Sequence, residues 1–200
     1  MRKAVMLSIR PKWCEEIANG EKTIEVRKIR PKLETPFKCY IYCTGYDALW
    51  VLDAPTREKY SFMAVAAYLE NPKGANKGNG KVIGEFICDR IYKIDKDSTD
   101  FLFKAGGLSV YKQAAEEKCG LCVAMTDDEL HGYLGHCQGY GWHISDLRIY
   151  DAPRELSEFR RATDPCDSCH AEYTWECTGC KKLGGDIKRP PQSWCYVKEG

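Results

Sequence analysis

The stretch from Gly20 to Lys28 reads Gly-Glu-Lys-Thr-Ile-Glu-Val-Arg-Lys, and it decides the fold more than any other part of the chain. A glycine turn brings Lys22 to the start of a predicted strand, in which apolar and polar residues alternate. Glu25 and Arg27 then share one strand face, about 7 Å apart. A lysine placed this way acts as a base if burial lowers its pKa, and the other two groups suit a base edge and a phosphate. A ladder of surface salt bridges is the alternative.

The segments around this motif predict an α+β protein that is mainly β. Pro11 suits the first turn of a helix, Asn19 with Gly20 suits its end, and Thr126 to Glu129 is a capping box. Gly84 marks a bulge. Several strands with few helices between them favour a small mixed barrel or sheet. Strands are predicted over residues 4–8, 22–28, 38–43, 81–92, 141–150 and 193–197, helices over 11–18, 54–69, 110–118 and 126–134, a loop over 71–80 and a helical turn over 153–160.

Composition indicates one domain, or one domain with a small appendage. The chain has 200 residues, of which 44% are hydrophobic and 30% charged, enough for a core and a solvated surface. Its net charge of +1 does not favour binding nucleic acid by bulk electrostatics, so any such binding needs a local pocket or patch. The longest mostly apolar stretch, Phe62 to Leu69, is too short for a membrane span. No targeting segment is visible, so a cytoplasmic protein without membrane contact is expected.

Four of the twelve cysteines predict one structural zinc ion. Two C-x2-C pairs with seven residues between them supply four thiolates, which close a tetrahedral site. Intramolecular disulfides are the alternative, and His170 is an alternative ligand. Residues 163–188 would then form a zinc knuckle, in which metal replaces a core too small to fold alone. The predicted ligands are Cys166, Cys169, Cys177 and Cys180.

Two further features near the cysteines leave alternatives open. Cys119 and Cys122 form another close pair, which either holds a second metal or lies buried at a helix end. Candidates to complete such a site are His131, His136 and Cys137. Four basic residues at the exit of the knuckle either touch phosphates or form a solvated face, and these are Lys181, Lys182, Lys188 and Arg189.

The motif and its flanks resemble the ASCH domain, a member of the PUA-like superfamily. The resemblance begins at Met6-Leu7-Ser8-Ile9-Arg10-Pro11, continues through a short helix into the Gly20 motif, and covers nearly the whole chain except the zinc segment. It implies a PUA-like β-barrel over residues 1–162 and 189–200, with the knuckle of residues 163–188 inserted before the last strand. Later segments that fit are Gly80–Glu85, Gly141–Leu147 and Pro190–Trp194.

The resemblance also implies a cleft beside the barrel that recognises RNA or a nucleotide. In such a binding module Lys22 and Arg27 meet phosphate and Glu25 meets a base edge. Trp142 either stacks on a base or belongs to the core, and His143 is either a base or a hydrogen-bonded structural residue. The residues that fall on the family's motif are Ser8, Arg10, Lys22, Glu25 and Arg27. Candidates for the pocket by position only are Trp142, His143 and Ser145.

Two other functions are also compatible with the sequence. One branch of the family resembles amidohydrolases for N4-acetylcytidine, which use a lysine, a threonine three residues later and a distant glutamate. Lys22 matches that lysine, Glu25 stands where the threonine is expected, and the distant glutamate falls near Glu116 or Glu117. In the other alternative the knuckle docks a protein partner and the cleft has no ligand.

Overall fold

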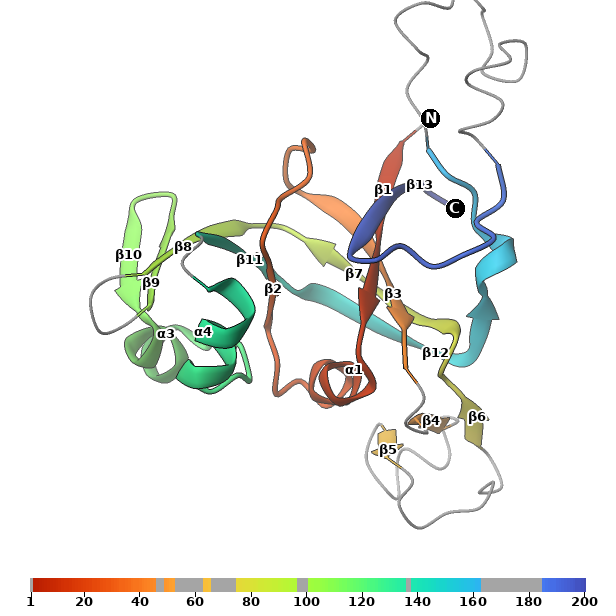
Figure 1. Cartoon of the computed structure of the whole chain (residues 1–200), viewed down its shortest axis with the longest axis horizontal. Helices are drawn as coiled ribbons and strands as arrows, with labels where there is room; N and C mark the ends of the chain where they lie inside the picture. The colour runs from red at the N-terminus through yellow and green to blue at the C-terminus, as the bar shows by residue number, and fades with distance from the viewer. Residues whose placement is uncertain are drawn as a thin grey trace, which may run out of the picture.

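The computed structural model describes residues 2–45, 49–52, 63–65, 75–96, 101–135, 138–162 and 185–200. In these ranges the strands form two five-stranded sheets and one three-stranded sheet. Figure 1 shows the first sheet on the right and the second on the left, the latter beside α3 (Lys112–Cys119) and α4 (Asp127–Leu134), with α1 (Pro11–Ala18) at the bottom between them. The predicted α+β, mainly β class is confirmed. Among the described strands the two large sheets form a barrel-like arrangement and do not close into one continuous barrel.

The first sheet has the order β12-β7-β3-β1-β13, and its strand β1 is deeply buried along most of its length. β1 pairs in parallel with β3, with Leu7 opposite Ile41, and the other neighbours are antiparallel. The run Ala4–Leu7 is fully buried, as a strand covered on both faces should be. The strands are β1 (Lys3–Ile9), β3 (Phe37–Cys43), β7 (Lys81–Cys88), β12 (Ser145–Glu155) and β13 (Trp194–Lys198).

The second sheet has the order β10-β9-β8-β11-β2, and all of its pairs are antiparallel. Its strands are β2 (Ile24–Arg27), β8 (Ile91–Lys96), β9 (Phe101–Ala105), β10 (Leu108–Tyr111) and β11 (Gly139–His143). The small third sheet, β5-β4-β6, contains β4 (Leu49–Leu52), β5 (Met63–Val65) and β6 (Ala75–Lys77).

Two pairs of consecutive strands pass from one large sheet into the other. β7 turns into β8 at Asp89 and Arg90, and β11 turns into β12 at Ile144. The turns are tied together, since the His143 backbone N–H donates to the Arg90 carbonyl at 2.9 Å and that of Ile144 to the Thr23 carbonyl at 2.9 Å. The predictions of single strands over 81–92 and 141–150 were therefore wrong, because each run bends where the chain changes sheet.

Other differences from the predicted elements also come from strand pairing. Residues 63–65 form a strand within the range 54–69, which was predicted as a helix. Residues 75–77 form a strand within the range 71–80, which was predicted as a loop. β12 stays paired with β7 as far as Glu155, so only the 3-10 turn Leu156–Glu158 remains of the predicted helical turn. The start of α1 at Pro11, its end at Ala18 and the Thr126 capping box are confirmed. The bulge beside Gly84 is also confirmed, as a register shift between β3 and β7.

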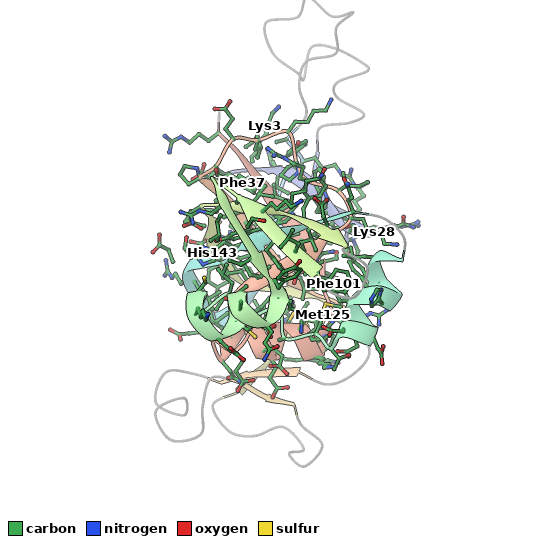
Figure 2. All side chains as sticks on the ribbon, turned by 90° about the vertical axis from the view of Figure 1, so that its left-hand side faces the viewer. Lys3, Lys28, Phe37, Phe101, Met125 and His143 are labelled. Carbon is green, nitrogen blue, oxygen red and sulfur yellow. The ribbon has the colours of Figure 1, made fainter. Side chains whose placement is uncertain are left out.

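The core consists of separate apolar clusters on either side of the bend. Trp142 is fully buried in the cluster between α1 and the first sheet, where it meets Phe37 edge-on at 5.8 Å. Phe101 and Leu130 belong to a second cluster under α3 and α4. Figure 2 labels Phe37 and Phe101, one from each cluster, among the side chains that fill the molecule.

The segment predicted as a zinc knuckle lies mostly outside the described residues. Where the described chain stops at 162 and resumes at 185, the two ends meet, because the Arg161 N–H donates to the Gly185 carbonyl at 2.9 Å. An insertion requires ends that meet in this way, and the domain division stays a prediction. None of the described helices has the length and apolar character that a membrane span requires.

Candidate functional site

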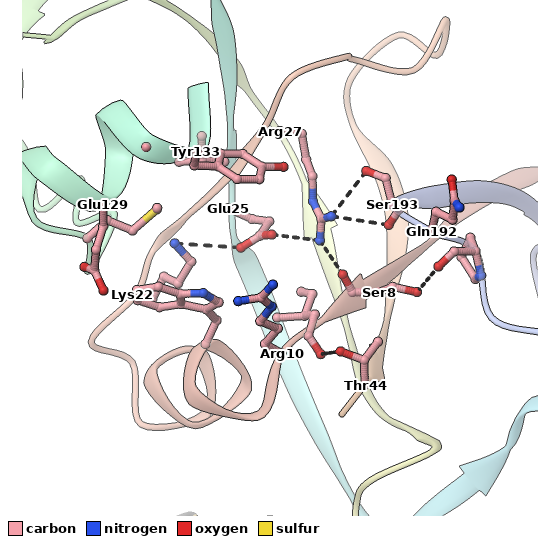
Figure 3. A pocket seen from close by; sticks show the side chains of 16 residues that line it. Ser8, Arg10, Lys22, Glu25, Arg27, Thr44, Glu129, Tyr133, Gln192 and Ser193 are labelled. Atoms are coloured by element: carbon pink, nitrogen blue, oxygen red, sulfur yellow. Dashed lines mark hydrogen bonds and ion pairs between the residues drawn. The ribbon is translucent and has the colours of Figure 1, made fainter. Parts of the chain in front are cut away.

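A cleft of about 530 Å³ lies where α1, β2, α4 and the segment before β13 converge, and Figure 3 shows it at close range. In the sequence α4 and the segment before β13 are far from α1 and β2, so the cleft exists only in the folded chain. Its lining residues are Ser8, Ile9, Arg10, Trp13, Lys22, Glu25, Val26, Arg27, Thr44, Met125, Glu129, Gly132, Tyr133, Pro191, Gln192 and Ser193.

The end of α1 delivers Lys22 to the cleft floor. Gly20 has a φ of +78°, which glycine adopts without strain, and the backbone N–H of Lys22 donates to the Glu16 carbonyl. The next residue, Thr23, exchanges hydrogen bonds with the loop after α3, and this brings the Val123 carbonyl within hydrogen-bonding reach of the lysine. Lys22 is only 2% exposed and its Nζ donates to that carbonyl.

Glu25 lies between two cations on the floor. Its Oε1 is 2.8 Å from Arg27 Nη2 and its Oε2 is 3.7 Å from Lys22 Nζ. The side chains of Glu25 and Arg27 meet because residues two apart in a strand point to the same face. This pairing confirms that they share a face, and their burial excludes the predicted alternative of a surface ladder.

Arg27 is also anchored by oxygens of Ser8 and Ser193. Its Nη2 donates to the Ser8 carbonyl at 2.9 Å, and its Nη1 donates to the carbonyl and the Oγ of Ser193 at 3.3 Å. Ser8 Oγ in turn donates to the Pro191 carbonyl at 2.6 Å. These bonds fix β1, β2 and the segment before β13 around one guanidinium group, as the dashed lines in Figure 3 show.

Burial governs the electrostatics of the floor. Desolvation lowers the pKa of Lys22 from its ordinary value, and the nearby Glu25 carboxylate acts in the opposite direction. Burial likewise raises the pKa of Tyr133, whose ring lies on the α4 side of the cleft. One carboxylate between two buried cations leaves the floor with an excess of positive charge.

The walls of the cleft carry two aromatic rings and a bridging ion pair. Trp13 comes from α1 and Tyr133 from α4. The Lys12 ammonium lies 4.3 Å from the Trp13 ring centroid and 2.9 Å from Glu129 Oε1, so it links the two helices. Glu129 also accepts the Thr126 N–H of the capping box, and both contacts lower its pKa, the Lys12 hydrogen bond most.

The structure brings together five of the residues predicted from the sequence and leaves four elsewhere. Trp142 is a core residue, so the alternative of base stacking is excluded for it. His143 Nδ1 lies 2.6 Å from Asp89 Oδ1 at the bend between the sheets, and Ser145 donates to the Ile87 carbonyl. Glu117 is exposed on α3, where it accepts from Gln113. The five at the cleft are Ser8, Arg10, Lys22, Glu25 and Arg27.

Several residues of the cleft were not predicted. Glu129 and Tyr133 are four apart on α4 and therefore share a helix face, a spacing that was available in the sequence. Trp13 follows the Ser8 to Pro11 segment and Ser193 lies in the Pro190–Trp194 segment, both part of the resemblance. What the sequence did not reveal is that α4 folds over the motif, because that contact joins distant parts of the chain.

The metal predictions fall largely on residues outside the described ranges. Cys166, Cys169, Cys177 and Cys180 lie there, as do His136, Cys137 and His170. Cys119 is exposed and Cys122 half-buried, each as a free thiol. Within the described part of the chain, no three His, Cys, Asp or Glu side chains gather in a way that would hold a metal ion.

Comparison with known proteins gives a likeness in structure only. No protein-family model matches the chain, and no curated protein matches it. The crystal structure of ASCH from Zymomonas mobilis superimposes with a TM-score of 0.52 and 14% identity, over 98% of this chain and 88% of that one. Two mutants of the Zymomonas mobilis protein give TM-scores of 0.50 and 0.51 at the same identity, over 99% of this chain and 92% and 90% of theirs. The chain therefore shares the fold of the Zymomonas mobilis ASCH protein, as the resemblance of its Gly20 motif leads one to expect.

Proposed function

We propose that this protein is a nucleotide- or RNA-binding module whose cleft holds one nucleoside unit. The observation that carries the proposal is the buried charged floor, in which Lys22, Glu25 and Arg27 are only 2–6% exposed. Burying an ion costs several kcal/mol, and apolar residues of similar size often serve stability equally well. A charged floor is therefore better explained by a ligand. The volume of about 530 Å³ suits a molecule of nucleoside size.

The contacts assign different tasks to the residues of the cleft. Glu25 accepts hydrogen bonds from the N–H groups of a base edge, as carboxylates do in nucleic-acid recognition. Arg27 orients Glu25, since both of its terminal nitrogens are taken by Glu25, Ser8 and Ser193. Trp13 and Tyr133 replace Trp142 as the aromatic rings on which a base stacks. The PUA-like fold supports RNA as the source of that base.

Titration with the four ribonucleosides, their 5′-monophosphates and short single-stranded RNA tests this proposal. Binding is expected to change tryptophan fluorescence, because Trp13 lines the cleft. Glu25→Gln should abolish binding, whereas Glu85→Gln, which alters a carboxylate held by Tyr150 on another face, should leave it intact. No binding of any of these ligands to the wild type would refute the proposal.

We propose amidohydrolysis of an acylated nucleoside as the second candidate, favoured by Lys22. Burial lowers the pKa of this lysine, and a lowered pKa favours the neutral amine that acts as a base. Glu129, not Glu117, is the distant glutamate that lines the cleft. The test is chromatography after incubation with N4-acetylcytidine. Lys22→Ala should abolish turnover and Lys38→Ala, a control distant from the cleft, should not; turnover that survives Lys22→Ala removes this lysine from the mechanism.

We also propose that Cys166, Cys169, Cys177 and Cys180 bind one structural zinc ion. The support is their spacing and their four thiolates, a donor set that zinc prefers and that requires a reducing, cytoplasmic environment. Elemental analysis of the purified protein should give one zinc per chain. Cys166→Ser should reduce that content and, if the knuckle docks a protein partner, weaken that contact. Full zinc content in the variant, or none in the wild type, would contradict this proposal.

A further inference from the structure

Arg10 differs from the other charged residues of the cleft in having no partner within the part of the chain that the structure describes. Among the described residues its guanidinium makes no hydrogen bond and no ion pair, whereas Lys22, Glu25, Arg27 and Glu129 all do. The residue is exposed and immediately precedes α1. Figure 3 shows its guanidinium pointing into the cleft below Glu25, with no dashed line to any neighbour.

The charges of the cleft do not balance, and Arg10 accounts for much of the difference. Glu25 compensates one of the two floor cations, and Lys12 compensates Glu129 on the wall. What remains is the positive charge of Arg10, to which Lys22 adds whenever its amine is protonated. A neutral nucleoside would leave the Arg10 charge uncompensated, while a phosphate group carries one or two negative charges.

The floor cations are poorly placed to bind that phosphate themselves. Lys22 Nζ donates to the Val123 carbonyl beneath the surface, and both terminal nitrogens of Arg27 are taken by protein oxygens. We therefore expect that Arg10, and not Lys22 or Arg27, meets the phosphate. A free guanidinium presents parallel N–H donors that match two oxygens of a phosphate.

We propose that Arg10 binds the phosphate of the ligand and makes the cleft select nucleotides over bare nucleosides. This inference rests on the proposed function, because it assumes that the base of the same unit lies against Glu25. The shared chemistry is a phosphate joined to a nucleoside, present at the end of a mononucleotide or within an RNA strand.

The experiment compares dissociation constants for the four ribonucleosides, their 5′-monophosphates and the corresponding dinucleoside monophosphates, using wild type, Arg10→Gln and Arg10→Lys. In the wild type, phosphate should tighten binding about tenfold, equivalent to roughly 1.4 kcal/mol. That preference should vanish in Arg10→Gln. It should be partly kept in Arg10→Lys, which retains the positive charge but lacks the parallel N–H donors of a guanidinium. Arg90→Gln, an exposed arginine at the β7–β8 turn outside the cleft, is the matched control and should keep the full preference.

The outcomes separate this inference from the function on which it rests. A preference for monophosphates identifies a terminal phosphate, and a preference for the dinucleoside identifies a strand; both support Arg10 if Arg10→Gln removes them. An unchanged preference in Arg10→Gln, or equal binding of nucleosides and nucleotides by the wild type, overturns the role of Arg10 and leaves base binding standing. Absence of all binding overturns both.

Discussion

Replacing Glu25 with glutamine tests whether the charged floor is as poorly hydrated as the burial of its side chains indicates. The substitution removes the one negative charge between Arg27 Nη2 at 2.8 Å and Lys22 Nζ at 3.7 Å. All three side chains are at most 8% exposed, so water screens the remaining cations poorly. Removing one partner of a buried ion pair costs about 3–5 kcal/mol. We expect about 3 kcal/mol, the lower end of that range, because the glutamine oxygen still accepts from Arg27.

The matched variant removes all three charges together. Lys22→Met, Glu25→Leu and Arg27→Met leave no buried ion, and such apolar replacements are often neutral or stabilising by about 1–4 kcal/mol. The triple variant should therefore be more stable than Glu25→Gln, even though the Val123, Ser8 and Ser193 carbonyls lose their donors. It should bind no nucleotide, because it lacks the donors and acceptors of the floor.

Urea unfolding followed by tryptophan fluorescence gives the free energies, and thermal melting provides a second measure. For a chain of 200 residues, a loss of 3 kcal/mol lowers the melting temperature by about 6–12 °C. If Glu25→Gln lost less than about 1 kcal/mol, the floor would be hydrated and the burial argument would fail. If the triple variant were less stable than Glu25→Gln, the charges would serve folding and would not indicate a ligand.

Three further predictions concern the scaffold around the cleft. Burial raises the pKa of the Cys88 thiol from 9.0 to about 12, so its contribution to stability is complete below pH 9 and is lost as the pH rises toward 12. The alkaline decline of stability in urea titrations should be shallower in Cys88→Ala, and an equal slope would contradict this. In Gly84→Ala the added Cβ would lie 2.5 Å from the Arg148 carbonyl oxygen, which should lower the free energy of unfolding by roughly 1–3 kcal/mol, whereas Gly185→Ala has no atom within 4 Å and should be near neutral. Thr126→Ala removes the cap of α4 and should cost about 1 kcal/mol in the same assay; no loss would mean that the capping box contributes nothing.

The sequence predicts best where a signal is local. The start of α1 at Pro11 follows from proline's fixed φ, and its end follows from the glycine turn that begins the motif. The capping box of α4 is equally local, because Thr126 and Glu129 satisfy each other's backbone. The placement of Glu25 and Arg27 on one face needs only the period of two in a strand.

The sequence fails where two distant segments decide the outcome. Nothing within residues 81–92 shows that the strand bends at Asp89, because the bend exists to pass the chain between two sheets. The residues next to Trp142 in the sequence are the same whether its side chain faces a cleft or the core. Only the contact with Phe37 in the folded chain shows that Trp142 belongs to the core. Glu117 and Glu129 are both glutamates on short helices, and tertiary placement alone brings Glu129 to the cleft.

The motif itself illustrates how burial changes the chemistry of a local pattern. On an isolated strand Lys22, Glu25 and Arg27 would form a solvated ladder worth little, because water screens exposed ion pairs. In the folded chain the loop after α3 covers Lys22 and the segment before β13 covers Arg27. The same three residues thereby become a desolvated floor with fixed donors and one fixed acceptor. Chemistry at this site thus depends on contacts about a hundred residues or more from the motif, such as the one between Lys22 and Val123 across 101 positions.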